Sequence, residues 1–139
     1  MIGRKIGVYC EAAYASETYL KKFTDRNEGV HRWIYPGSDY KFEAQLAEPY
    51  RTKRDHDIQL VVPDTDAQMK FAEKHAGFAM LPCLMADRNP HLKRISNIVH
   101  RSDIWLLSHK DSRDNTRMQL FREFLVGVFT QQQKRMWGD

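Results

Sequence analysis

The most constraining feature of this sequence is an alternation between short apolar runs and segments whose apolar residues recur every three or four positions. The runs of strand length occupy residues 5–10, 30–35, 58–62, 78–81 and 104–108. The segments with helical spacing occupy residues 12–23, 66–76 and 115–135. Strands that alternate with helices are typical of βαβ crossovers, so the pattern predicts an α/β fold with a mixed, mostly parallel sheet.

The helix expected at residues 66–76 has recognisable start and stop signals. Thr65 followed by Gln68 has the spacing of a capping box, and Gly77 suits a left-handed C-terminal cap. Residues 38–57 are polar and are interrupted by Pro49, and only residues 50–53 there suggest a short strand.

The last helix has the clearest apolar face. The face is formed by Met118, Phe121, Phe124, Leu125, Val128 and Phe129, and Leu120 widens it. Roughly 20 residues at about 1.5 Å each give a helix about 30 Å long, which needs a large surface to pack against.

Composition and charge exclude several classes of protein. With 139 residues, 42% hydrophobic and 29% charged, the chain suits one globular domain rather than a disordered one. No apolar run approaches the ~18 residues of a membrane span, and the first residues lack the pattern of a signal peptide, which favours a cytoplasmic protein. The net charge of +4 suggests a nucleic-acid-binding surface. Acidic residues are interleaved with the basic ones, however, which favours a mixed-charge exterior.

Catalytic motifs are absent from the sequence. It contains no glycine-rich phosphate loop, no nucleophile-elbow serine and no pair of histidines at metal spacing. Cys10 and Cys83 are interpreted as free structural thiols. We therefore expect no enzyme activity, no cofactor and no metal, with a thiol enzyme that uses Cys83 or Cys10 as an alternative.

Ligand sites in α/β folds lie at the carboxyl ends of strands. In this sequence those ends are Cys10–Glu11, residues 63–65 and residues 82–83. The backbone N–H groups of the helix that begins near Thr65 favour a carboxylate or another small anion. Asp64 and Asp66 oppose an anion there unless capping engages their side chains.

Three segments resemble the effector-binding domain of LysR-type transcriptional regulators. The segment AEKHAGFAMLPCLMADRNPHLKRI, residues 72–95, resembles that family's helix, glycine, strand and Leu-Pro segment. The segment DIWLLSHKDSRDNTRMQLFREFL, residues 103–125, resembles its closing strand, His-x-Asp-x-Arg turn and final helix. The segment VYCEAAYAS, with Tyr9 and Tyr14, is similar to its re-entry into the second lobe. The sequence departs from the family at Ala79, where a second glycine is usual, and residues 38–57 carry no motif that aligns.

The resemblance implies a three-layer lobe like that of type II periplasmic binding proteins. It implies that residues 1–139 form a single domain: the second lobe of the effector-binding domain, with its returning strand and C-terminal helix at about residues 103–137. The winged helix-turn-helix domain that contacts DNA in this family is then absent from these residues. The implied function is to sense a small-molecule effector and to couple its binding to the conformation of a regulator oligomer.

The resemblance also implies which residues contact the effector and the partner. Cleft-side positions that carry over as effector contacts are Cys10, Glu11, Asp64, Thr65 and Phe78. In the family the final helix packs on the first lobe, most of which is then absent from these residues. Without that cover, the apolar residues of the helix are expected to self-associate in a homodimer or larger oligomer: Phe121, Phe124, Leu125, Val128 and Phe129. The alternatives are a solute-binding domain of a transport system and an oligomerisation module.

Overall fold

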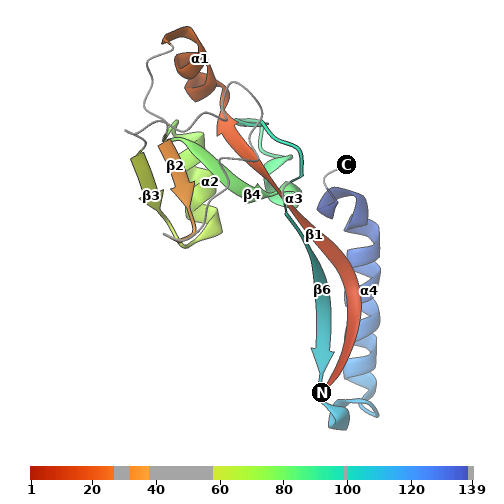
Figure 1. The fold of residues 1–139 in the computed structure, drawn as a ribbon. Coiled ribbons are helices and arrows are strands. Elements are labelled where there is room, and N and C mark those ends of the chain that lie inside the picture. Colours follow the sequence, from red (N-terminus) through yellow and green to blue (C-terminus); the bar gives the residue numbers. More distant parts are fainter. Residues whose placement is uncertain (27–31, 38–57, 99, 138–139) are drawn as a thin grey trace.

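The computed structural model describes residues 1–26, 32–37, 58–98 and 100–137 (Figure 1). Its strands are β1 (Ile2–Ser16), β2 (Arg32–Tyr35), β3 (Ile58–Val61), β4 (Phe78–Pro82), β5 (Leu92–Arg94) and β6 (His100–Ser108). Its α-helices are α1 (Glu17–Arg26), α2 (Thr65–Glu73), α3 (Cys83–Ala86) and α4 (Thr116–Met136). The strand expected at residues 50–53 and the start of the run at 30–35 lie outside the described residues.

Strand β1 is much longer than the sequence pattern predicts. We expected a strand at residues 5–10 and a helix from residue 12, but the strand continues to Ser16 and α1 begins at Glu17. Ala12, Ala13 and Ala15 are fully buried in the apolar clusters on the two faces of the sheet, while β4 pairs with residues 11–14 and β5 with residues 14–16. The Ser16 hydroxyl accepts a hydrogen bond from the Tyr19 backbone N–H at 3.1 Å and so caps the helix.

The sheet has the strand order β3-β2-β4-β1-β5, and β6 also pairs with β1. The α/β class and the mixed sheet are confirmed. Strand β2 is parallel to β3 and β4, whereas β1 is antiparallel to β4, β5 and β6. The sheet contains more antiparallel pairing than the predicted mostly parallel sheet. The reason is that α1 leads to β2, which lies beside β3 and β4 rather than beside β1.

Buried side chains form one apolar cluster on each face of this sheet. Because neighbouring strand residues point to opposite faces, β1 contributes Ala13 and Ala15 to one cluster and Ala12 and Tyr14 to the other. The first cluster includes Tyr19 and Leu20 of α1 together with Trp33, Tyr35 and Phe78. The second includes Ala72 of α2 and Cys83 and Ala86 of α3. The sheet therefore lies between α1 on one side and α2 and α3 on the other.

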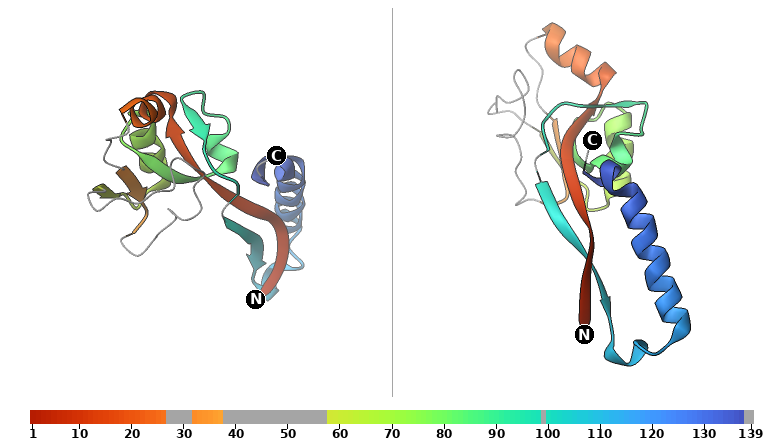
Figure 2. Two further views of the ribbon diagram at one scale, coloured as in Figure 1. Left: turned by 45° about the horizontal axis from the view of Figure 1, so that its top comes forward. Right: turned by 90° about the vertical axis from the view of Figure 1, so that its right-hand side faces the viewer.

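The first half of β1 leaves this compact part and forms a two-stranded ribbon with β6, and α4 lies along the ribbon (Figures 1 and 2). Gly7 lets the helix approach closely. A Cβ atom there would lie 2.9 Å from the Met136 methyl group and 3.4 Å from the Phe129 ring. Strand β1 thus connects a compact part with a ribbon-and-helix part.

Helix α2 forms as expected, but its ends differ from the prediction. The N-cap is Asp64, one residue earlier than predicted, and its carboxylate accepts from the Ala67 N–H at 2.8 Å. Gln68 donates to the Val62 carbonyl at 2.6 Å, so no capping box forms with Thr65. At the other end His75, with φ 66°, takes the left-handed position predicted for Gly77.

Gly77 is required for a different reason. A Cβ atom at Gly77 would lie 2.3 Å from the Arg32 carbonyl oxygen of β2, so only glycine fits where α2 returns to the sheet.

Candidate functional site

The carboxyl ends of the three parallel strands lie at one edge of the sheet. Tyr35 ends β2, Val61 ends β3, and Pro82 ends β4. Glu11 lies opposite Pro82 in the antiparallel pairing, so β1 contributes Glu11 to the same edge. With neighbouring strands about 4.8 Å apart, the three steps from β1 to β3 span roughly 14 Å.

The β3 end of the edge carries the start of α2. Asp64 is exposed, and its carboxylate is engaged in capping. Thr65 is the first helical residue and is partly exposed. The α2 N-terminus is thus accessible at the predicted place, although Asp64 and Asp66 leave negative charge beside it.

The β1 end of the edge carries Glu11. We expected Glu11 at the end of a strand, but it lies inside β1, where the pairing with β4 begins. Its carboxylate accepts a hydrogen bond from the Tyr9 hydroxyl at 2.6 Å, and its side chain is half-buried. This pair stands where β1 passes from the compact part into the ribbon.

Two of the predicted effector contacts are core residues. Cys10 is 1% exposed and belongs to the cluster with α2 and α3, and it also lies inside β1 rather than at a strand end. Phe78 is 0% exposed, and its ring centroid lies 4.9 Å from that of Tyr19. Phe78 also begins β4, so it lies at the end of the strand away from the carboxyl edge. Neither side chain reaches solvent, because each is packed in one of the two apolar clusters that cover the sheet.

A polar cluster on the α3 side, in which Tyr14 is buried and Asp87 and Arg94 are partly exposed, was not predicted. The Tyr14 hydroxyl donates to Asp87 Oδ1 at 2.6 Å, and Arg94 donates to both carboxylate oxygens of Asp87. Burial, followed by the hydrogen bond to Asp87, raises the pKa of Tyr14, and the same carboxylate raises the pKa of Arg94. No sequence pattern links residues 73 and 80 positions apart, so only the fold reveals this contact.

The thiol of Cys83 lies beside this cluster. Its side chain is fully buried, and burial raises the pKa of the thiol. A buried neutral thiol is a weak nucleophile, which disfavours the alternative of a thiol enzyme. Within the described part of the chain, no group of three or more His, Cys, Asp or Glu residues is arranged to hold a metal ion.

The apolar residues of α4 that we expected to self-associate lie on two sides of the helix. Phe121, Phe124 and Val128 are exposed. Leu125 and Phe129, which we expected to be exposed with them, are half-buried, since the inner side of the helix packs toward β1.

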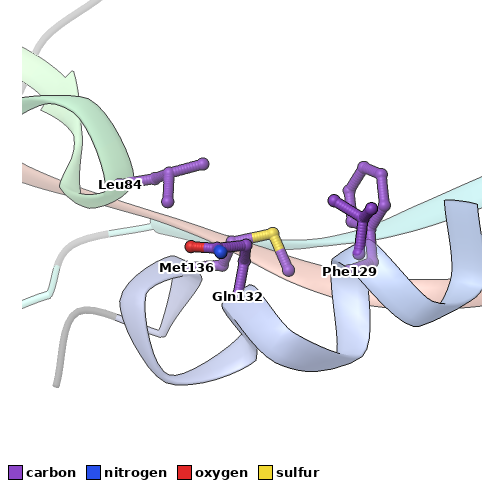
Figure 3. Close-up of a pocket in the computed structure, with 5 residues that line it drawn as sticks. Leu84, Phe129, Gln132 and Met136 are labelled. Atoms are coloured by element: carbon purple, nitrogen blue, oxygen red, sulfur yellow. The ribbon is translucent and has the colours of Figure 1, made fainter.

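A pocket lies between α3 and α4 (Figure 3). Its volume is about 100 Å³, and it is lined by Leu84 from α3 and by Val128, Phe129, Gln132 and Met136 from α4. This volume is below the usual range of about 300–1,000 Å³ for small-molecule sites, and the lining offers little polar recognition. We therefore do not assign the effector to this pocket.

Comparison with known proteins decides the family. The model of the LysR substrate binding domain matches residues 28–130, which is most of the chain. The chain belongs to the LysR substrate-binding domain family. None of the curated proteins compared matches this chain significantly. Among the described residues, no helix is long and apolar enough to cross a membrane.

Solved LysR-type structures share the fold at low sequence identity. The regulatory domain of CrgA from Neisseria meningitidis has a TM-score of 0.68 and 18% identity, over 92% of this chain and 68% of that one. The effector domain of AmpR from Pseudomonas aeruginosa has a TM-score of 0.65 and 15% identity, over 95% and 67%. Full-length LysG from Corynebacterium glutamicum, solved with its effector Arg bound, has a TM-score of 0.65 and 12% identity, over 94% and 46%.

This LysR substrate-binding chain is shorter than the proteins it resembles. It spans about two thirds of the regulatory domains and about half of the full-length regulators that it resembles. The family and the periplasmic-binding-protein-like fold implied by the three sequence segments are confirmed.

Proposed function

We propose that this chain is the effector-sensing part of a LysR-type transcriptional regulator, in which binding of a small metabolite is coupled to the conformation of the regulator oligomer. The family match over residues 28–130 is the observation that carries the proposal. The regulator acts in the cytoplasm, and DNA is contacted through a winged helix-turn-helix domain outside these residues. The chain acts by binding and has no catalytic role.

The effector is proposed to bind along the carboxyl edge of the sheet. Glu11 and Thr65 are the predicted contacts whose side chains are partly exposed at this edge, and Asp64 supports the site by capping α2. The first turn of α2 binds a carboxylate of the effector, while Glu11 accepts a hydrogen bond from a donor group at the β1 end of the edge. These two demands favour an elongated metabolite that carries both kinds of group.

Strand β1 provides a physical route for coupling. The same strand contributes Glu11 to the edge and Gly7 to the contact with α4. A ligand that binds one arrangement of the two parts more tightly than another shifts the population toward it.

Thermal-shift screening of carboxylates, aromatic acids and amino acids tests the proposal, with calorimetry to measure affinity. Glu11→Gln and Thr65→Val are expected to weaken binding of the active compound roughly tenfold each, the effect of one lost hydrogen bond to a charged group. Glu17→Gln on α1 and Thr116→Val, at the first position of α4, are matched controls and should leave affinity unchanged. A compound that binds both edge variants as tightly as the unmodified chain would remove this edge from the proposal.

A further inference from the structure

The two cysteines of the chain lie opposite each other where the pairing of β1 with β4 ends. The last pair in the antiparallel register is Glu11 opposite Pro82. Each step back along β1 is matched by a step forward along β4, so the next position sets Cys10 opposite Cys83. Cys83 begins α3, but Pro82 before it has φ −58° and ψ 128°, so the chain keeps an extended path up to Cys83.

The side chains of the two cysteines also lie on the same side of the sheet. Both belong to the apolar cluster between the sheet and the helices α2 and α3, where Cys10 is 1% exposed and Cys83 is 0% exposed. Burial raises the pKa of the Cys83 thiol most, and Cys10 adds a smaller increase, because two thiolates close together repel each other. The thiols are therefore neighbours within one cluster.

The spacing at this position suits a disulfide bond. Residues directly opposite in an antiparallel pair have Cα atoms about 4.5 or 5.5 Å apart. Disulfides join residues whose Cα atoms are about 4.4–6.8 Å apart, so either kind of pair meets the requirement. Cys10 and Cys83 are free thiols in this structure, and they can be joined with little movement of the backbone.

We propose that Cys10 and Cys83 form a reversible intrachain disulfide when the chain is exposed to a hydroperoxide. In the cytoplasm, where we propose that the regulator acts, disulfides are usually transient and sense oxidants. The pair is thus a redox-sensitive site separate from effector binding, and its formation requires no effector.

The oxidation balances with the hydroperoxide as the only co-reactant. The sulfur of one thiol attacks a peroxide oxygen, the O–O bond breaks, and a sulfenic acid forms while water or an alcohol leaves. The sulfur of the second thiol then displaces the sulfenic oxygen, which leaves as water, and the S–S bond forms. Two thiols have lost two electrons and two protons. Two molecules of a small thiol such as glutathione reverse the change and become its disulfide.

The disulfide would join two segments at the junction between the compact part and the ribbon. Cys10 precedes Glu11, which stands where β1 passes into the ribbon. Cys83 precedes Leu84, which lines the pocket against α4. Helix α3 lies near this junction (Figure 1), so the bond would fix β1 against the helix that contacts α4.

Thiol counting on the 139-residue chain tests whether the bond forms. The folded chain, at low micromolar concentration, is treated with hydrogen peroxide, unfolded in urea, alkylated with N-ethylmaleimide and analysed by mass spectrometry. We expect the number of alkylated thiols to fall from two to none, with the Cys10 and Cys83 peptides linked in a digest made without reductant. Dithiothreitol should restore both thiols. A chain that keeps two alkylatable thiols, or that links through disulfides between chains, overturns the proposal.

Equilibration with glutathione tests whether the fold brings the thiols together. The measured quantity is the ratio of reduced glutathione squared to oxidised glutathione at which half of the chain is oxidised. We expect this ratio to be roughly 100-fold higher for the folded chain than for the chain in urea, because a disulfide that fits the native state is stabilised by folding. Equal ratios in the two conditions overturn the proposal, and this comparison needs no substitution.

The melting temperature shows whether the bond constrains the chain. The oxidised chain is expected to melt about 10 °C above the reduced chain, since the bond closes a long loop between residues 73 positions apart. Cys10→Ala and Cys83→Ala are matched controls, and peroxide should raise the melting temperature of neither. Either an unchanged melting temperature in the oxidised chain or an equal rise in a single variant contradicts the Cys10–Cys83 bond.

Discussion

The hydroxyl of Tyr14 on β1 donates a hydrogen bond of 2.6 Å to the carboxylate of Asp87, 73 residues further along the chain. Asp87 directly follows α3, and Arg94 of β5 holds the other side of its carboxylate. The buried Tyr14 side chain therefore links β1 to the end of α3 and, through Asp87, to Arg94 of β5.

Removing the Tyr14 hydroxyl should destabilise the fold without changing its packing. We expect Tyr14→Phe to lower the free energy of unfolding by about 1.5–3 kcal/mol, the usual contribution of a hydrogen bond to a charged group. Urea denaturation followed by circular dichroism measures the loss. In a double-mutant cycle with Asp87→Ala the two losses should be less than additive, and full additivity would show that the pair does not interact.

Stability should fall at alkaline pH. The pKa values of Tyr14 and Cys83 are raised in the folded chain, so each group holds its proton more tightly there than in the unfolded chain. Their contributions are fully present below the ordinary values of 10.0 and 9.0, and are lost as pH rises above them. Urea midpoints measured from pH 7 to pH 11 should therefore decline, starting near pH 9. Tyr14→Phe should make the decline above pH 10 shallower, and an unchanged profile would argue against this assignment.

Gly77 and Gly37 form a natural comparison. Gly77→Ala should cost more than about 2 kcal/mol, because its Cβ would meet the Arg32 carbonyl oxygen at 2.3 Å and the backbone must shift. Gly37→Ala should change stability by less than about 1 kcal/mol, since its Cβ meets no atom within 4 Å. Thermal denaturation of the two variants side by side checks the difference, and equal melting temperatures would contradict the close approach.

Phe78 tests whether a predicted effector contact is instead a core residue. Phe78→Ala should lower the free energy of unfolding by about 3–5 kcal/mol, because it leaves a cavity beside Tyr19 and Trp33. Phe71→Ala, on the exposed surface of α2, should cost less than about 1 kcal/mol. If Phe78→Leu, which keeps most of the volume, restores stability but not effector affinity, the residue contacts ligand after all. Calorimetry of the Leu variant separates the two roles.

Local patterns predicted the elements that carry their own signals. The apolar run at residues 58–62 and the periodicity of residues 66–76 and 115–135 correspond to β3, α2 and α4 within a few residues. The errors occurred where tertiary contacts override local preference. Residues 12–15 have the composition of a helix but are held in β1 by partners on both edges, and His75 rather than Gly77 adopts the left-handed cap.

The sequence alone determined the family, since the motifs of residues 72–95 and 103–125 are local and keep their order, and it determined that α4 is long and apolar. Only the tertiary structure decided which predicted contacts are accessible. Burial depends on what packs above a residue, so the structure placed Cys10 and Phe78 in the core and left Glu11 and Thr65 at the sheet edge. It also decided which side of α4 faces outward, because that side is fixed by Gly7 on a strand more than 100 residues away in the chain.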